Sequence, residues 1–385
     1  MSAGIVVVGG GPVGLAFALA ASRLANIDVT VVERSTASAA APELRAVFDH
    51  RVYALSPTSL EFLGELSATP APARAAKVRA MQVWGDDGKS HLDLAQGQPI
   101  ATIVEHAALM FALEHALTRN DRVRMLRGVT LAAMRANGNQ RELDMIDGST
   151  LHADLVVGAD GSRSQIRDWA GITAETKDYE SDGIVANFHA EFAHGDVARQ
   201  WFASDSVLAY LPLPQNQISV VWSVTKQKSV ALKALSDEQF CSCVAAAGHK
   251  ALGALTLASP VDRFPLARVI ARHSVAPGLA LMGDAAHAVH PLAGQGVNLG
   301  FADARILFEM LRQRSKFSAI GDALVLKKYE RARREATIAI SEVTDKLRAL
   351  YMSDVKAAGW IRNQGLTLLN AVPRAKSALI DYAIS

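Results

Sequence analysis

A glycine-rich turn between two apolar runs, all within the first 33 residues, constrains the fold more than any other stretch. Ile5–Val8 is a short β-branched run that predicts a buried parallel strand, and Val29–Val32 is a second such run that ends at Glu33. A helical apolar pattern with Leu15 and Leu19 lies between the two runs. The turn has the spacing GxGxxG and consists of Gly9, Gly11 and Gly14, with Pro12 and Val13 between the last two.

This order of strand, glycine turn, helix, strand and acid is typical of dinucleotide binding. The glycines permit a tight turn and let the backbone approach a pyrophosphate, which lies on the helix start. Glu33 follows the last glycine by about 20 residues, a spacing at which an acid accepts hydrogen bonds from the adenosine ribose. The motif predicts a dinucleotide site but does not distinguish NAD from FAD.

A second turn begins after the apolar run Leu155–Val157. It contains Asp160 and leads into a helix start at which Ser164 and Arg167 lie three residues apart on one face. An ordinary strand-to-helix turn and a ligand contact fit this segment equally well.

A third turn is predicted around residues 280–300. The apolar run Gly278–Met282 ends at Gly283 and Asp284, and the glycine cluster Gly294–Gly296 then opens a helix. The apolar residues predicted for this helix are Val297, Leu299, Ala302, Ile306, Leu307 and Met310. A strand thus delivers a carboxylate close to unpaired backbone amides, which suits a ligand with hydroxyl groups and negative charge, such as a flavin dinucleotide.

The middle of the chain predicts a substrate half rich in β-structure. Residues 184–225 alternate between apolar and polar side chains, which indicates an antiparallel sheet with one covered face, and we expect a turn at Leu211–Pro214. A separate hairpin is expected between Val78 and Leu94, and a strand over 129–134. Large aromatic side chains form either the core of the sheet or the wall of a pocket, and they are Trp201, Phe202, Tyr210 and Trp222.

Capping residues and periodicity locate three helices. Ser56 caps one helix, and Ser236 with Gln239 forms a capping box for another. The apolar stripe over 103–117 predicts the third helix, in which Glu105 is either a first-turn acid or a ligand contact.

Composition excludes several classes of protein. The formal net charge is +2, and no run of Lys and Arg is interleaved with aromatic residues, so we expect no nucleic-acid partner. Met1–Ser22 is uncharged, but it lacks a basic start and glycines interrupt it, which disfavours an export signal or a membrane span. The two cysteines, Cys241 and Cys243, lie two residues apart on a predicted helix, so we expect free thiols in the reducing cytoplasm.

From about residue 322 the chain is helical and relatively basic, with acids interspersed. This pattern favours a solvated helix with ion pairs, although a helix that lies on an anionic membrane surface has the same features. The basic residues of this region include Lys327, Lys328, Arg331, Arg333, Arg334, Lys346 and Arg348.

Taken in this order, the three turns resemble those of the single-component flavin aromatic hydroxylases. Within that class the chain is similar to the ubiquinone-biosynthesis hydroxylase family, the group that includes UbiH, UbiI, UbiF and Coq6. The segments that carry this resemblance are Asp49–Ser56, Leu211–Leu213, Gly283–His287 and His290–Gly300.

The resemblance implies an α/β fold like that of p-hydroxybenzoate hydroxylase. A doubly wound, Rossmann-like FAD domain (1–75, 97–178 and 275–320) would be interleaved with a mixed or antiparallel β-sheet substrate domain (76–96 and 179–274). A helical C-terminal region (321–385) would follow. The implied cofactor contacts are Gly9, Gly11, Pro12, Val13, Gly14, Glu33, Arg34, Arg51, Glu105, Val129, Asp160, Gly283, Asp284, Pro291, Gly294, Gln295, Gly296, Val297 and Asn298, with His290 and Pro291 facing the flavin ring.

The resemblance also implies the chemistry. The enzyme would hydroxylate the ring of a polyprenylated phenol or benzoquinol in ubiquinone biosynthesis by way of a flavin C4a-hydroperoxide, using O2 and a transient NAD(P)H donor. It would be cytoplasmic or peripheral at the inner membrane and could contact other quinone-biosynthesis proteins. A small soluble aromatic substrate, or a non-catalytic scaffold stabilised by FAD, are the alternatives. Zinc binding by His287 and His290 is disfavoured because no third ligand stands with them.

Overall fold

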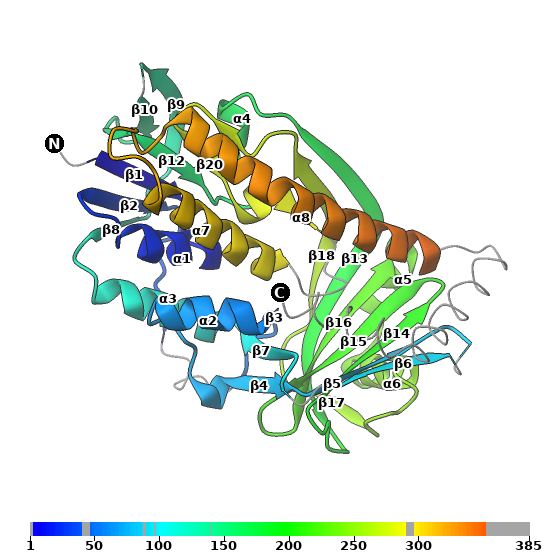
Figure 1. Cartoon of the computed structure of the whole chain (residues 1–385). Coiled ribbons are helices and arrows are strands. Elements are labelled where there is room, and N and C mark those ends of the chain that lie inside the picture. Colours follow the sequence, from blue (N-terminus) through cyan, green and yellow to red (C-terminus); the bar gives the residue numbers. More distant parts are fainter. Residues whose placement is uncertain are drawn as a thin grey trace.

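The computed structural model describes residues 3–40, 47–87, 90–95, 98–138, 140–289 and 296–351. A six-stranded sheet flanked by helices forms one half of the molecule, and a larger nine-stranded sheet forms the other (Figure 1). The long helix α8 (Ala323–Tyr351) begins beside the first sheet and runs toward the second (Figure 1). This confirms the predicted fold of a Rossmann-like half with a β-rich half and a helical C-terminal region.

The six-stranded sheet has the order β19-β20-β12-β1-β2-β8. Five of its strands are parallel, and β19 is an antiparallel edge strand. The strands are β1 (Ala3–Val8), β2 (Ile27–Glu33), β8 (Val123–Arg127), β12 (Leu155–Gly158), β19 (Val275–Ala276) and β20 (Leu279–Leu281). Because β1, β12 and β20 are adjacent and parallel, the three turns that follow them lie at one edge of the sheet.

Helix α1 (Pro12–Ala21) packs between α3 (His106–Thr118) and α7 (Gly296–Arg312). Its residues from Gly14 to Ala21 are all buried, because helices and the sheet surround it. The predicted stripe of α7 is only partly right: Val297, Leu299 and Leu307 are buried, but Ala302, Ile306 and Met310 are half-buried. The buried face instead includes Phe301, Asp303, Ala304 and Leu311.

The prediction that the third helix begins near residue 103 is wrong. Ala101–Glu105 forms strand β7, which pairs with β3 (Val52–Leu55) and β4 (Ala75–Val78), and α3 begins at His106. The β-branched residues Thr102, Ile103 and Val104 favour a strand, and pairing on both sides supplies the long-range contacts that override the helical periodicity. Ser56 caps helix α2 (Pro57–Glu65), as predicted.

The nine-stranded sheet has the order β21-β18-β13-β16-β15-β14-β5-β6, and β17 pairs with β13. Its pairs are antiparallel except that of β14 with β5. The strands are β5 (Ala80–Trp84), β6 (His91–Ala95), β13 (Ala174–Ala190), β14 (Val197–Ala203), β15 (Ser206–Leu213), β16 (Gln217–Thr225), β17 (Leu255–Leu257), β18 (Asp262–Ala271) and β21 (His287–Ala288). The predicted antiparallel sheet is confirmed, as is the hairpin of β5 and β6.

The turn expected at Leu211–Pro214 lies further along the chain. Leu211–Leu213 belongs to β15, and the reversal occurs at Gln215 and Asn216, both of which have φ near 60° (60° and 56°). Two successive residues with positive φ match the twist of a hairpin, so this pair rather than the prolines makes the turn.

One face of the nine-stranded sheet is covered by α5 (Lys226–Lys233) and α6 (Asp237–Ala247). Trp201, Tyr210 and Trp222 are buried in this core, and Trp84 stacks on Trp201 with ring centroids 5.1 Å apart. Phe202 is buried on the opposite face. The core alternative therefore holds for these aromatic residues.

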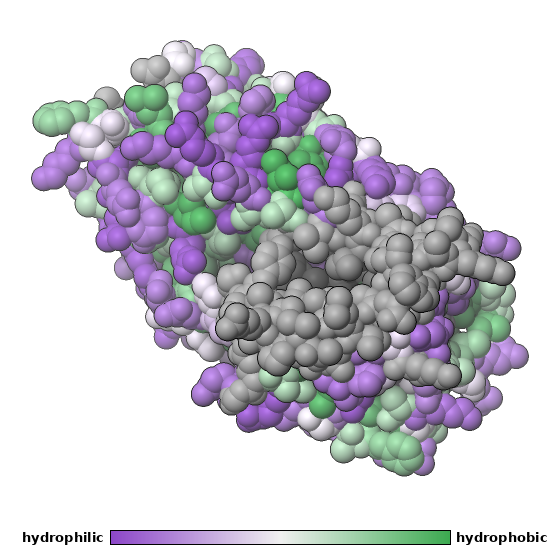
Figure 2. Space-filling model, turned by 45° about the vertical axis from the view of Figure 1, so that its right-hand side comes forward, coloured by the Kyte–Doolittle hydropathy of each residue, from purple (hydrophilic) through white to green (hydrophobic). Residues whose placement is uncertain are grey.

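Helix α6 begins with the predicted capping box, and both cysteines on it are free thiols. A small sheet of β9 (Leu131–Asn137), β10 (Gln140–Met145) and β11 (Thr150–Ala153) and the short helix α4 (Gln165–Trp169) complete the first half, so the strand expected from Val129 begins at Leu131. None of the described helices combines the length and the apolar character needed to cross a bilayer. Figure 2 shows one face of the molecule, on which hydrophilic and hydrophobic described residues are interspersed.

Candidate functional site

The first and second turns press against each other. A Cβ atom on Gly9, whose φ is +110°, would lie 2.2 Å from the carbonyl oxygen of Ala159, immediately before Asp160. A Cβ on Gly14 would lie 2.1 Å from the carbonyl oxygen of Gly9. Only glycine fits at these two positions, because any side chain would separate the turns.

The first and third turns also meet. A Cβ on Gly300 would lie 2.3 Å from Cγ2 of Val13, and one on Gly283 would lie 3.3 Å from the same atom. The start of α1, the Gly283 turn and the first turn of α7 therefore share one contact. Gly11, in contrast, has nothing within 4 Å of its Cβ position, so its backbone faces open space. Close packing at the other glycines and an open approach at Gly11 are the features that a pyrophosphate-binding loop requires.

Glu33 ends β2 beside the glycine turn. Its Oε2 accepts a hydrogen bond from the amide of Gly10 (2.6 Å), and its Oε1 accepts one from Ser35 (2.7 Å). The amide of Val129 donates to the carbonyl oxygen of Glu33 (3.1 Å), whereas the side chain of Arg34 is exposed. Of the predicted cofactor contacts, Glu33 and Val129 thus lie together.

Asp284 lies in the short 3-10 turn η3 (Gly283–Ala285) after β20. Its side chain is solvent-exposed, yet crowding by surrounding protein raises the pKa of its carboxyl group, against the opposing effects of His287 and Arg51. No described residue donates a hydrogen bond to the Asp284 carboxyl group, so its oxygens are available to a ligand.

Arg51 follows the loop that enters β3, and its guanidinium carbon lies 5.6 Å from the centre of the Tyr53 ring. The Tyr53 hydroxyl and Nδ1 of His106 are 3.0 Å apart. Burial raises the pKa of Tyr53, and Arg51 opposes this shift. Since Arg51 also acts on Asp284, the two predicted cofactor contacts share one electrostatic neighbourhood.

Asp160 uses its carboxylate within the protein. Oδ1 accepts from the hydroxyl of Ser164 (2.6 Å) and Oδ2 from the amide of Ile166 (3.2 Å), while burial raises the pKa of Asp160. Ser164 caps α4 and is not on an exposed helix face. The buried Arg167 donates to the carbonyl oxygen of Ala285 (3.1 Å), so the second turn supports the third.

Glu105 has a role that was not among the two alternatives considered from the sequence. It is fully buried before the first turn of α3, where it forms an ion pair with Arg74 and accepts from the amide of Asp49 (2.6 Å). Arg74 in turn lies over the Phe48 ring, 4.1 Å from its centre. These contacts fix the segment that leads to Arg51.

The first turn of α7 joins the Gly283 turn to β3. The side chain of Asn298 accepts from the amide of Ser56 (3.0 Å) and the hydroxyl of Ser59 (2.8 Å), and it donates to Ala54 (2.8 Å). Val297 is buried and Gly296 is half-buried. Asn298 therefore orients the start of α7, and the backbone amides of a helix's first turn have no partner within the helix itself.

A buried charge cluster, which the sequence did not reveal, lies behind the third turn. Asp303 on α7 is fully buried, and its carboxylate contacts Nε2 of His287 (2.7 Å), Nε of Arg333 on α8 (2.6 Å) and the amide of Gly283 (2.8 Å). Burial alone would raise the pKa of Asp303, but His287 and Arg333 hold it below its usual value. Burial disfavours the charged imidazolium and so lowers the pKa of His287, but the contact with Asp303 outweighs this effect and raises the pKa. The sequence signal for this cluster is Asp303 itself, a charged residue four positions after Leu299 on an otherwise apolar helix face.

Four predicted residues, His290, Pro291, Gly294 and Gln295, lie outside the described residues. Within the described ranges, no cluster of three or more His, Cys, Asp and Glu side chains could hold a metal ion.

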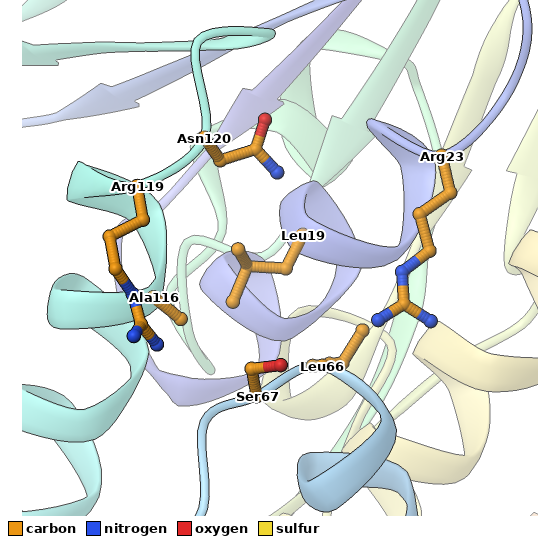
Figure 3. A pocket seen from close by; sticks show the side chains of 7 residues that line it. All are labelled: Leu19, Arg23, Leu66, Ser67, Ala116, Arg119 and Asn120. Atoms are coloured by element: carbon orange, nitrogen blue, oxygen red, sulfur yellow. The ribbon is translucent and has the colours of Figure 1, made fainter.

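A cavity of about 270 Å³ opens elsewhere, at the ends of α1, α2 and α3 (Figure 3). Arg23 and Arg119 line it, and Arg23 donates to the carbonyl oxygen of Glu65 at the end of α2. Because three helix C-termini meet there, the arginines neutralise partial negative charge, and the cavity has no part in the site at the sheet edge.

The fold and the site define a dinucleotide-binding flavoprotein. The open backbone at Gly11, the acceptor Glu33, the available carboxyl group of Asp284 and the helix start at Gly296 fit the phosphates and hydroxyl groups of FAD. Residues 2–344 match the family described as FAD binding domain, and the chain belongs to that family. Within it the chain is an FAD-dependent aromatic monooxygenase of the ubiquinone-biosynthesis hydroxylase group, which confirms the predicted resemblance.

Full-length relatives support this assignment. The chain is 31% identical over 386 residues to 3-demethoxyubiquinol 3-hydroxylase of Escherichia coli (strain K12), with 99% of this chain and 98% of that protein covered. It is 30% identical over 431 residues to the mitochondrial ubiquinone biosynthesis monooxygenase COQ6 of Drosophila melanogaster (99% and 89% covered). It is also 30% identical over 391 residues to ubiquinone hydroxylase UbiL of Rhodospirillum rubrum (99% and 89% covered).

Solved structures share the fold. The p-nitrophenol 4-monooxygenase PnpA from Pseudomonas putida DLL-E4 superposes with a TM-score of 0.77 at 19% identity, with 100% of this chain and 98% of that chain covered. HpxO from Klebsiella pneumoniae, complexed with FAD and uric acid, superposes with a TM-score of 0.77 at 18% identity (99% and 97% covered).

Proposed function

We propose that the protein hydroxylates the aromatic ring of a polyprenylated phenol or benzoquinol in ubiquinone biosynthesis, with O2 and NAD(P)H as co-substrates. The convergence of three turns on one sheet edge, in a chain with full-length similarity to ubiquinone hydroxylases, supports this proposal. FAD, when bound and reduced, supplies activated oxygen to an electron-rich ring.

The residues of the chain hold and orient the cofactor. Gly11 leaves space for the pyrophosphate, Glu33 accepts the adenosine ribose hydroxyls, and Arg51 neutralises phosphate charge. Asp284 accepts hydroxyl groups of the ribityl chain. The first amides of α7, with their partial positive charge, stabilise negative charge on the reduced ring system.

The β-rich half supplies the substrate chamber. We propose the division into an FAD domain (1–75, 97–178 and 275–320), a substrate domain (76–96 and 179–274) and a C-terminal helical region (321–385). The composition of the two large sheets supports this division. Strands β13–β18 make up most of the nine-stranded sheet, whereas most of the six-stranded sheet consists of β1, β2, β8, β12 and β20. The proposed reaction requires an apolar chamber between the halves that excludes water from the reacting centre.

The test begins with purified protein reconstituted with FAD. It should be yellow, consume O2 when NAD(P)H and a phenolic quinone precursor are added, and yield a product heavier by one oxygen atom. Mass spectrometry of quinones in a deletion strain would identify the step, because the substrate accumulates. Failure to bind FAD, or oxidation of NAD(P)H without any oxygenated product from prenylated or short aromatic substrates, would refute the proposal.

A further inference from the structure

Two buried polar side chains on the nine-stranded sheet have hydrogen-bonding atoms without a partner. Asn187 on β13 and Ser219 on β16 are fully buried and directly opposite each other in the strand register. Oδ1 of Asn187 and Oγ of Ser219 have no hydrogen-bond partner among the described residues. A buried polar atom left unpaired costs about 1–3 kcal/mol, so its retention calls for an explanation.

Alternation along the strands shows which way the pair faces. Ile218, Val220 and Trp222 pack under α5 and α6, so Ser219 points to the other face of the sheet. Leu211, opposite Ser219 on β15, belongs to a cluster with Phe48. The pair therefore lies on the face turned toward the FAD-binding half.

The side chain of Asn187 is tied to the cofactor segment. Its Nδ2 donates to the carbonyl oxygens of Phe48 and Asp49, both at 3.0 Å. These two residues belong to the loop that ends at Arg51, just before β3. These two bonds fix the carboxamide plane and turn Oδ1 away from the loop. The acceptor is thus held in place without a partner of its own.

Small and apolar side chains surround the pair on this face. Ala209, Leu211 and Val221 are half-buried there, in contrast to the fully covered opposite face. The loop at Phe48 and Asp49 lies against the pair, and the half-buried apolar side chains beside the pair give the surface on which an aromatic ring with a hydroxyl group would lie.

We propose that Asn187 and Ser219 bind a ring hydroxyl group of the aromatic substrate. Oδ1 of Asn187 accepts the hydroxyl proton, and the Ser219 hydroxyl donates to the ring oxygen. The pair is a positioning device that sets which ring carbon is presented for oxygenation. This inference rests on the proposed function, because it names the contact that orients the proposed substrate.

The test uses the FAD-loaded protein and the variant Ser219→Ala. Two ligands are titrated by the change in flavin absorbance: a phenol with a short prenyl tail, and the same molecule with hydrogen in place of the hydroxyl. We expect the Kd for the phenol to rise about tenfold and the Kd for the deoxy analogue to stay unchanged, because one hydrogen bond to a buried group is lost. Thermal stability should be unchanged or slightly higher, since the removed hydroxyl has no protein partner.

Ser229→Ala is the matched control, because Ser229 is a buried serine on α5, beyond the opposite face of the sheet. It should alter neither Kd. Equal changes for both ligands, or no change for the phenol, would mean that the pair holds only water or serves the fold, and would overturn the inference. Product formation by the wild-type protein is measured in parallel. If the wild-type protein forms product but Ser219→Ala binds the phenol normally, only the substrate contact is refuted and the proposed function stands.

Discussion

Replacing Asp303 by asparagine removes the charge at the centre of the buried cluster behind the third turn. Asp303 is fully buried, and the Arg333 side chain is only 8% exposed. The variant keeps the shape of the side chain but leaves Arg333 charged and without its carboxylate. Breaking a buried ion pair from one side costs about 3–5 kcal/mol, a large share of the roughly 5–15 kcal/mol by which a protein is stable.

The assay is urea unfolding of the FAD-loaded protein, followed by flavin fluorescence and circular dichroism. The matched control is Glu309→Gln, which removes the partner of Arg312 on the same helix, where the two side chains are 35% and 59% exposed. That exposed pair should contribute no more than about 0.5 kcal/mol. In the double variant Asp303→Asn with Arg333→Met, most of the lost stability should return, because no unpaired charge remains. A cost of Asp303→Asn below about 1 kcal/mol would refute the argument that the cluster is a coupled ion pair.

The contact between His287 and Asp303 also predicts how the stability of the protein depends on pH. The pKa of His287 is raised in the folded state, so its contribution is fully present below the unfolded value of about 6.5 and is lost as the pH rises through the folded pKa. The pKa of Asp303 is lowered, so its contribution is present above the unfolded value of about 3.9 and is lost as the pH falls through the folded pKa. The difference between wild type and Asp303→Asn should therefore be largest at mildly acidic pH and smaller at alkaline pH. A difference that grows with alkaline pH would contradict this assignment.

Three further outcomes follow from the glycine turn, the ribose acceptor and a helix cap. Gly11→Ala should fold with the wild-type melting temperature and bind FAD more weakly, whereas Gly9→Ala should lower the melting temperature as well, because only the second Cβ meets protein atoms. Equal melting temperatures for the two variants would contradict the contact between the first two turns. Glu33→Gln should raise the Kd for FAD about tenfold through loss of a charged acceptor, measured by flavin fluorescence quenching. Ser236→Ala should cost about 1 kcal/mol in urea unfolding without changing FAD affinity, because Ser236 caps α6 far from the cofactor turns.

Local signals in the sequence predicted the elements that carry the site, and neighbouring strands decided where prediction failed. The turn after Ile5–Val8 could be identified because the GxGxxG spacing lies within one strand-turn-helix unit, although the contact that requires glycine at Gly9 comes from Ala159 in the second turn. The strand at Ala101–Glu105 could not, because its β-structure depends on pairing with two strands distant in sequence. The turn of the hairpin at Gln215 was predicted a few residues too early, because the prolines before it are the stronger local turn signal.

Buried charge was the other part that sequence reasoning could not place. The ion pair of Glu105 could not be predicted, because its partner Arg74 lies in a short 3-10 segment, η2 (Pro72–Arg74), that no periodicity marks. No role was predicted for Asp303, which shares the buried face of α7 with Leu299 and Leu307. In both cases the partner comes from a distant segment, and only the fold shows that the charge is paired.

The carboxylates around the three turns can therefore be sorted by what satisfies them. Asp303, Glu105 and Asp160 accept hydrogen bonds from protein groups, so their shape and charge serve the fold. Glu33 accepts two backbone amides, and its remaining lone pairs can still accept ribose hydroxyls. Asp284 alone among these five has no hydrogen-bond donor in the described part of the chain, although the protein is built to hold its turn rigidly through Gly283, Arg167 and the cluster at Asp303. We therefore propose that the partner of the Asp284 carboxyl group is a ligand.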